Sequence, residues 1–139
     1  METDTGKPYF KRVLIIDDNE IDRYIAQRRL ENQLFCEEVI LMESAPLALE
    51  YLRSLENTPE LLPQFIFLDI RMPEMDGFGF LEEYQNLSDK VKVNCIMLML
   101  SSSLDEYDHQ RASESPYINR FINKPLNAED IDKLLRDFT

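Results

Sequence analysis

Short hydrophobic runs recur along this chain, and four of them are followed by polar residues that can support chemistry. The runs are too short for helices, and the first is rich in β-branched residues, so each is predicted to be a buried strand. In chain order, the predicted strands cover residues 12–16, 38–42, 65–68, 95–100 and 118–122.

Stretches with helical spacing or capping residues lie between these runs. Helices are predicted after Asn19, after Ser44, at about 77–86, at about 104–114 and after Asn127, since Asn and Ser are favourable caps. The first helix carries apolar Ile21, Tyr24, Ile25 and Leu30, and the predicted inner positions of the second are Leu47, Leu49, Tyr51, Leu52 and Leu55. The last helix is predicted to face inward with Ile131, Leu134, Leu135 and Phe138.

This alternation of strand and helix predicts an α/β fold with a doubly wound, five-stranded parallel sheet covered on both faces. Right-handed crossovers favour the strand order 2-1-3-4-5. Residues 1–8 are polar and contain Gly and Pro, so we predict a flexible leader there and a single domain over 9–139. A domain of this size is large enough to bury a core.

The formal charge of −12 argues against direct nucleic-acid binding, which relies on clustered Lys and Arg. We therefore interpret the basic cluster of Arg23, Arg28 and Arg29 as a solvated helix face. The sequence contains neither a signal-peptide pattern nor an apolar run long enough to span a membrane. Cys36 and Cys95 have no metal-binding spacing, so free thiols in a reducing cytoplasm are expected.

Polar side chains follow four of the five predicted strands, and parallel strands end at the same edge of a sheet. They are Asp17 and Asp18, Asp69, Ser101, and Lys124. Open α/β sheets bind ligands at this edge. Neighbouring carboxylates repel one another unless a cation compensates, and Mg²⁺ takes oxygen ligands of this kind. We predict that Asp18 and Asp69 bind the metal directly, that Asp17 holds a metal-bound water, and that the Arg71 carbonyl supplies a further oxygen.

The same groups suit phosphoryl transfer to a carboxylate. A carboxylate nucleophile forms a transient acyl phosphate, and positioning and charge neutralisation supply most of the catalysis. Lys124 would act as a mobile cation and Ser101 as a hydroxyl donor. Taken singly, an Asp or Ser at a strand end is more often a simple cap, so the combination carries this interpretation.

This combination, with Pro125 after Lys124 and the stretch Met-Pro-Glu-Met-Asp-Gly-Phe at 72–78, resembles the receiver domain of two-component response regulators over about residues 10–138. The resemblance implies a flavodoxin-like receiver fold of the single-domain type. It also implies the residue roles: Asp69 as phosphoacceptor, Asp17 and Asp18 as metal-binding acids, Ser101 as switch hydroxyl, Lys124 as phosphoryl contact and Phe121 as switch aromatic. Receivers often have a cis bond before the proline, although trans is commoner in general.

By this resemblance, a sensor histidine kinase or a histidine phosphotransfer protein is the expected donor, with a downstream protein partner or onward phosphotransfer as output. The chain would promote its own phosphorylation and dephosphorylation without being a classical turnover enzyme. Arg71 and Ser103 occupy positions that influence dephosphorylation in receivers. Whether Arg71 shields the acyl phosphate or guides the donor stays open here.

Three alternatives remain. The first is a receiver-like scaffold that signals without phosphorylation, for which absence of saturable metal binding would be the signature. The second is a small phosphohydrolase, which would need a second acid near Asp69 and a substrate cap. The third is flavodoxin-like FMN binding, which is disfavoured because the first turn lacks a phosphate loop.

Overall fold

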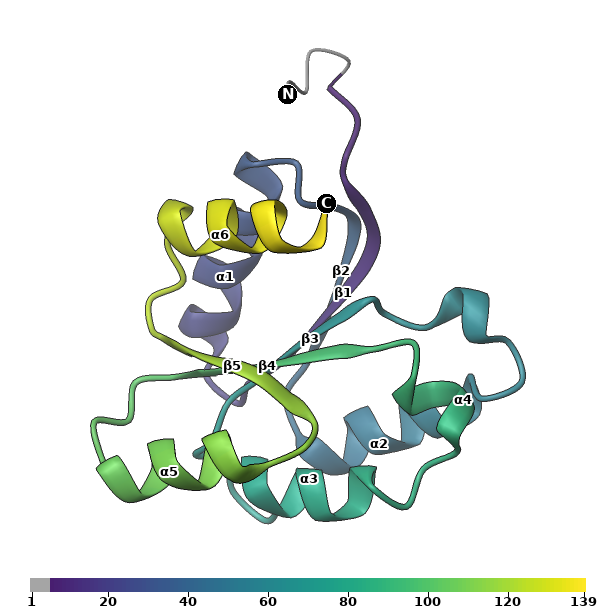
Figure 1. Ribbon diagram of the computed structural model, residues 1–139, viewed down its shortest axis with the longest axis vertical. Coiled ribbons are helices and arrows are strands. Elements are labelled where there is room, and N and C mark those ends of the chain that lie inside the picture. The colour runs from purple at the N-terminus through teal and green to yellow at the C-terminus, as the bar shows by residue number, and fades with distance from the viewer. Residues whose placement is uncertain (1–5) are drawn as a thin grey trace.

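The computed structural model describes residues 6–139, and within them a five-stranded parallel sheet forms the centre of the molecule (Figure 1). The order β2-β1-β3-β4-β5 confirms the prediction. The strands are β1 (Phe10–Ile16), β2 (Cys36–Met42), β3 (Phe65–Leu68), β4 (Ile96–Ser101) and β5 (Ile118–Asn123). Most of the leader predicted for residues 1–8 lies outside the described residues, which begin at Gly6.

The helices are α1 (Glu20–Asn32), α2 (Ala45–Ser54), α3 (Gly77–Tyr84), α4 (Asp89–Lys92), α5 (Glu106–Glu114) and α6 (Ala128–Phe138), with a short 3₁₀ turn η1 (Pro59–Leu61). Asn19, Ser44 and Asn127 cap α1, α2 and α6 through their side chains, as predicted. The single turn α4, capped by Ser88, was not predicted.

The helices cover the sheet in two layers, α1 and α6 on one face and α2 to α5 on the other (Figure 1). Successive strand residues point to opposite faces, so β1 contributes to both cores. Val13 and Ile15 pack with α1 and α6, whereas Leu14 and Ile16 pack with α2 and α3. All four are buried, as expected for a parallel sheet covered on both sides.

The apolar residues of α1 and α2 are not all buried. On α1, Leu30 is buried together with Ala26, whereas Ile21 and Tyr24 are 68% and 59% exposed. The predicted inner position Leu47 of α2 is wrong, because it is 49% exposed and this helix packs through Ala45, Ala48, Leu49 and Leu52.

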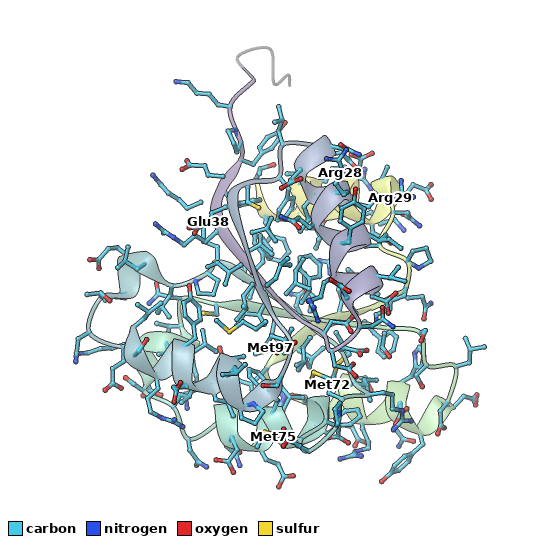
Figure 2. All side chains as sticks on the ribbon, turned by 180° about the vertical axis from the view of Figure 1, so that it is seen from behind. Arg28, Arg29, Glu38, Met72, Met75 and Met97 are labelled. Atoms are coloured by element: carbon cyan, nitrogen blue, oxygen red, sulfur yellow. The ribbon has the colours of Figure 1, made fainter. Side chains whose placement is uncertain are left out.

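The basic cluster on α1 is only partly a solvated face. Arg28 and Arg29 are exposed (Figure 2). Arg23 is half-buried, and its guanidinium donates a hydrogen bond of 2.7 Å to the backbone oxygen of Asp17, so its assignment to the solvated face is wrong.

The register of the sheet brings distant residues to one edge. Ile16 pairs with Leu68, and Leu68 pairs with Met99. Asp17 and Asp69 therefore leave the sheet side by side. Ser101 pairs with Asn123, so Lys124 follows next to Ser101. Among the described residues, no helix is long and apolar enough to span a bilayer.

Candidate functional site

The carboxylates of Asp17, Asp18 and Asp69 form a cluster at the carboxyl ends of β1 and β3. One oxygen from each lies within 4.8 Å of the others. Asp17 and Asp69 are buried and Asp18 is exposed. The sheet ladder fixes the buried pair, because the Asp69 N–H donates to the Ile16 carbonyl at 3.0 Å. The predicted gathering of these acids therefore occurs.

Lys124 closes the cluster from β5. Its Nζ lies 2.6 Å from Asp17 Oδ2, 2.8 Å from Asp22 Oδ2 and 3.5 Å from Asp69 Oδ1. Its backbone N–H donates to the Ser101 carbonyl at 3.0 Å, which joins the ends of β4 and β5. Burial lowers the pKa of Lys124, but its hydrogen bonds to Asp17 and Asp22 outweigh this, so the pKa is raised and the ammonium stays charged.

Asp22 was not among the predicted site residues. It lies in the first turn of α1, where an acid is also expected for favourable interaction with the helix dipole. Its closeness in sequence to Asp17 and Asp18 was the signal that could have indicated a second role.

Asp69 has an unusual electrostatic environment for a carboxylate. Burial and the neighbouring Asp17 carboxylate raise its pKa from 3.8 to about 6, against the opposing effect of Lys124. The Ile70 N–H donates to Asp69 Oδ1 at 2.9 Å, and Lys124 approaches the same oxygen. Within residues 6–139, both of these polar contacts of Asp69 involve its Oδ1 atom. The other carboxylate oxygen of Asp69, Oδ2, is therefore available for reaction.

The loop after β3 packs closely on the Asp69 backbone. A Cβ atom on Gly77 would lie 2.6 Å from the Asp69 carbonyl oxygen, so only glycine fits at this position. The Gly77 N–H donates to the Ile70 carbonyl at 2.8 Å, and the Asp76 side chain caps α3 by accepting from the Gly79 N–H. The loop is thus held by its own hydrogen bonds close to the acid cluster.

Ser101 is the last residue of β4, and Phe121 lies within β5, two residues before its end. Ser101 is 1% exposed, and its Oγ accepts a hydrogen bond from the Ser103 N–H at 3.2 Å. Phe121 is half-buried and stacks on the ring of His109, with centroids 3.9 Å apart and planes at 25°. The Lys124–Pro125 peptide is cis, where sequence statistics alone favour trans.

The donor set of this cluster fits a divalent cation such as Mg²⁺. Three carboxylates supply hard oxygen ligands, and Lys124 offsets only part of their charge. Acidic clusters of this kind are typical of Mg²⁺ sites in receiver domains. The fourth predicted ligand is the backbone carbonyl of Arg71. The side chain of Arg71 forms an ion pair with Asp108 on α5.

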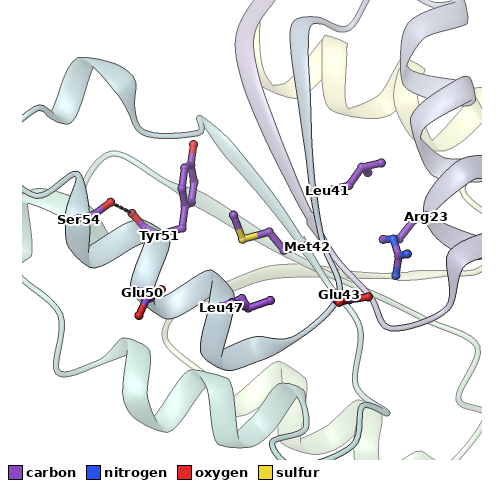
Figure 3. A pocket seen from close by; sticks show the side chains of 8 residues that line it. All are labelled: Arg23, Leu41, Met42, Glu43, Leu47, Glu50, Tyr51 and Ser54. Atoms are coloured by element: carbon purple, nitrogen blue, oxygen red, sulfur yellow. Dashed lines mark hydrogen bonds between the residues drawn. The ribbon is translucent and has the colours of Figure 1, made fainter.

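A larger hollow lies away from these acids. Its volume is about 610 Å³, and residues of α1, β2 and α2 line it (Figure 3). Leu41, Met42, Leu47 and Tyr51 give it an apolar wall, and Arg23 is its link to the acid cluster. Arg23, Glu43, Glu50 and Ser54 also line it, whereas the acid cluster and Lys124 gather at the edge of the sheet.

Comparisons with known proteins agree with this geometry. The profile of the response regulator receiver domain matches residues 13–136. A probable methanogenesis regulatory protein, FilR2 of Methanothrix harundinacea, is 26% identical over 125 residues, covering 90% of this chain and 79% of that protein. The chain spans 53% of the rice two-component response regulator ORR1, to which it is 31% identical over 127 residues.

Solved structures show the same architecture. A two-component response regulator from Cytophaga hutchinsonii superposes with a TM-score of 0.84 at 28% identity, covering 91% of this chain and 95% of that one. The receiver domain of the histidine kinase CKI1 from Arabidopsis thaliana, solved with Mg²⁺ and BeF₃⁻, gives 0.75 at 26% identity, covering 91% and 90%.

Proposed function

This chain belongs to the response regulator receiver family, and we propose that it accepts a phosphoryl group on Asp69. The donor we propose is a phosphohistidine on a sensor histidine kinase or a histidine phosphotransfer protein. The observation that carries this proposal is the contact of the Lys124 ammonium with both Asp17 and Asp69. It places a cation beside a buried carboxylate that still has a free oxygen.

In the transfer step, Asp69 Oδ2 forms a bond to phosphorus while the P–N bond of the phosphoimidazole breaks. The imidazole leaves with the bonding electron pair, and its nitrogen takes up a proton from solvent. A pKa of about 6 keeps Asp69 largely ionised at neutral pH, which the nucleophile requires. Lys124 then stabilises the charge on the phosphoryl oxygens.

We assign the metal site to Asp17, Asp18, Asp69 and the Arg71 carbonyl. Mg²⁺ would neutralise negative charge on the phosphoryl group and on the acids that surround it. Asp18 is the most accessible acid of the cluster, so it suits direct coordination. Asp17 accepts hydrogen bonds from the Asn19 N–H at 2.9 Å and from Lys124, which suits the less direct role of holding a water.

Phosphorylation adds a charge of about −1.5 to −2 in a buried place. Ser101 would turn its hydroxyl toward the new oxygens and give up its bond from the Ser103 N–H. Phe121 would move into the space that opens, and the surface of α5, β5 and α6 would change. We propose that a downstream protein reads this surface, or that the phosphoryl group passes onward, within the reducing cytoplasm that suits two free cysteines.

A phosphorylation-independent scaffold is the alternative, and labelling separates the two. Protein is incubated with radiolabelled acetyl phosphate and Mg²⁺, then quantified after gel filtration. We expect labelling in the wild type, none in Asp69→Asn, and none with excess EDTA. Asp76→Asn is the matched control, since it changes a nearby loop acid and retains a capping side chain. Equal labelling of Asp69→Asn and wild type would refute the assignment, and an unlabelled wild type without saturable Mg²⁺ binding would favour the scaffold.

A further inference from the structure

An ion pair connects the acceptor loop to α5. The Arg71 guanidinium contacts the Asp108 carboxylate, which lies in the first turn of α5. Asp108 is 3% exposed, whereas the Arg71 side chain is 63% exposed. Asp108 Oδ2 also accepts a hydrogen bond of 2.8 Å from Ser103 Oγ. A buried carboxylate is therefore paired with a cation that is itself largely exposed to solvent.

Both partners of Asp108 are close in sequence to groups of the proposed site. Arg71 follows Asp69 by two residues, and Ser103 follows Ser101 by two. The Ser103 N–H donates to Ser101 Oγ, and the Ser103 carbonyl lies 3.0 Å from the His109 ring nitrogen. The network therefore touches the acceptor loop, the switch hydroxyl and the helix that follows.

Once Asp69 is phosphorylated, two anions compete for the Arg71 guanidinium: the Asp108 carboxylate and the phosphoryl group. The planar fork of donors of the guanidinium pairs with carboxylate and with phosphate, and both pairings are charge-assisted. The phosphoryl group carries more charge than the Asp108 carboxylate and lies on the same loop as Arg71. Asp108 would then keep only Ser103 as a partner, and an uncompensated buried carboxylate is unfavourable.

We propose that Asp108 is a positioning residue that holds the Arg71 guanidinium against α5 until Asp69 is phosphorylated, when Arg71 exchanges it for the phosphoryl group. The inference rests on the proposed function. Releasing Asp108 removes the ion pair between the acceptor loop and the start of α5, so the charge change at Asp69 reaches this helix directly.

Beryllofluoride with saturating Mg²⁺ tests the exchange, because BeF₃⁻ stands in for the phosphoryl group, and its affinity is measured by titration calorimetry. Asp108→Asn keeps an acceptor for Ser103 but frees Arg71, so BeF₃⁻ should bind at least about fivefold more tightly. Arg71→Gln keeps the backbone carbonyl and should weaken binding by about the same factor. The double variant should bind like Arg71→Gln alone, because Asp108 acts only through Arg71.

Asp105→Asn is the matched control, since it removes the same charge from the cap of the same helix; its affinity should equal that of the wild type. An Asp108→Asn effect that persists without Arg71 would indicate a purely structural role and overturn the proposal. An unchanged affinity in Arg71→Gln, an exposed position that tolerates substitution, would overturn it even if Asp108→Asn fails to fold. Absence of BeF₃⁻ binding in the wild type would instead refute the proposed function, and the exchange with it.

Discussion

Replacing Lys124 by Met should strongly destabilise the metal-free protein. The ammonium lies within 3.5 Å of Asp17, Asp22 and Asp69, and its side chain is 12% exposed. Met retains most of the apolar stem and removes the charge. The buried carboxylates of Asp17 and Asp69 would then lie close together without the cation that now contacts both of them.

The magnitude follows from the burial of this cluster. Removing one partner of a buried ion pair costs about 3–5 kcal/mol, because the remaining charge is left uncompensated. For a domain of this length, each kcal/mol lowers the melting temperature by about 4 °C. Lys124→Met should therefore melt about 12–20 °C below the wild type in EDTA at pH 7.5. Asp22 adds little to this figure, since its side chain is 35% exposed.

Two conditions should restore part of the loss. A carboxyl group whose pKa is raised on folding contributes stability at low pH, and this stability is lost as the pH rises through the raised pKa. At pH 5 Asp69 is mostly protonated, so the difference in stability between Lys124→Met and the wild type should be smaller there. Mg²⁺ should also raise the stability of the variant above its own metal-free value, since a ligand at 100 times its Kd adds about 2.7 kcal/mol.

Thermal and urea unfolding at both pH values, with EDTA or Mg²⁺, measure these effects. Lys133→Met on the exposed side of α6 is the control for loss of one positive charge. A deficit below about 1 kcal/mol, the range of surface pairs, would refute the electrostatic reasoning. So would a deficit of the same size at pH 5 and pH 7.5.

Three further predictions use the same unfolding measurements. The pKa of Asp69 is about 6, raised from 3.8, so the free energy of unfolding of the metal-free wild type should fall by about 3 kcal/mol as the pH rises from below 4 to above 6. Asp69→Asn should lack this part of the dependence of stability on pH. Identical dependences in the two proteins would contradict the assignment. Gly77→Ala should cost about 1–3 kcal/mol, because its Cβ would lie 2.6 Å from a backbone oxygen. Gly79→Ala should be nearly neutral, because its Cβ would meet the flexible Met75 side chain at 3.0 Å and Asp76 Oδ1 at an ordinary 3.5 Å, and equal costs for the two variants would refute the close approach. Leu134→Ala should cost about 2–5 kcal/mol, while Leu104→Ala, at an 88% exposed position, should stay within about 0.5 kcal/mol.

The gathering of Asp17, Asp69, Ser101 and Lys124 could be predicted because it depends on topology alone. Each residue directly follows or ends a parallel strand, and the order of the strands makes their carboxyl ends adjacent. No knowledge of side-chain packing is needed for this step. The fold and the centre of the site therefore follow from the positions of short apolar runs and the residues after them.

The orientation of the helices was harder to predict. Leu47 of α2 and Ile21 of α1 fit a helical pattern of apolar residues, yet both are exposed. Small residues do much of the packing instead, since Ala48 and Ala26 are buried where these helices meet the sheet. An apolar pattern does not identify the inner side of a helix when alanines occupy it and larger apolar residues lie elsewhere.

The polarity of α5 explains why its ion pair could not be predicted and why it matters. Only Asp108 and Ala112 of this helix are buried among the described residues, so α5 lacks the apolar stripe that normally anchors a surface helix. A sequence pattern assigns an acid in such a helix to solvent, and Arg71, its partner, is 37 residues away. With little apolar surface to hold it, the start of α5 is attached by the contacts of Asp108 with Arg71 and Ser103 and by the stacking of His109 on Phe121. An element attached in this way responds to a change in charge more readily than one attached by hydrophobic packing, because the competing anion acts directly on the contact that holds it.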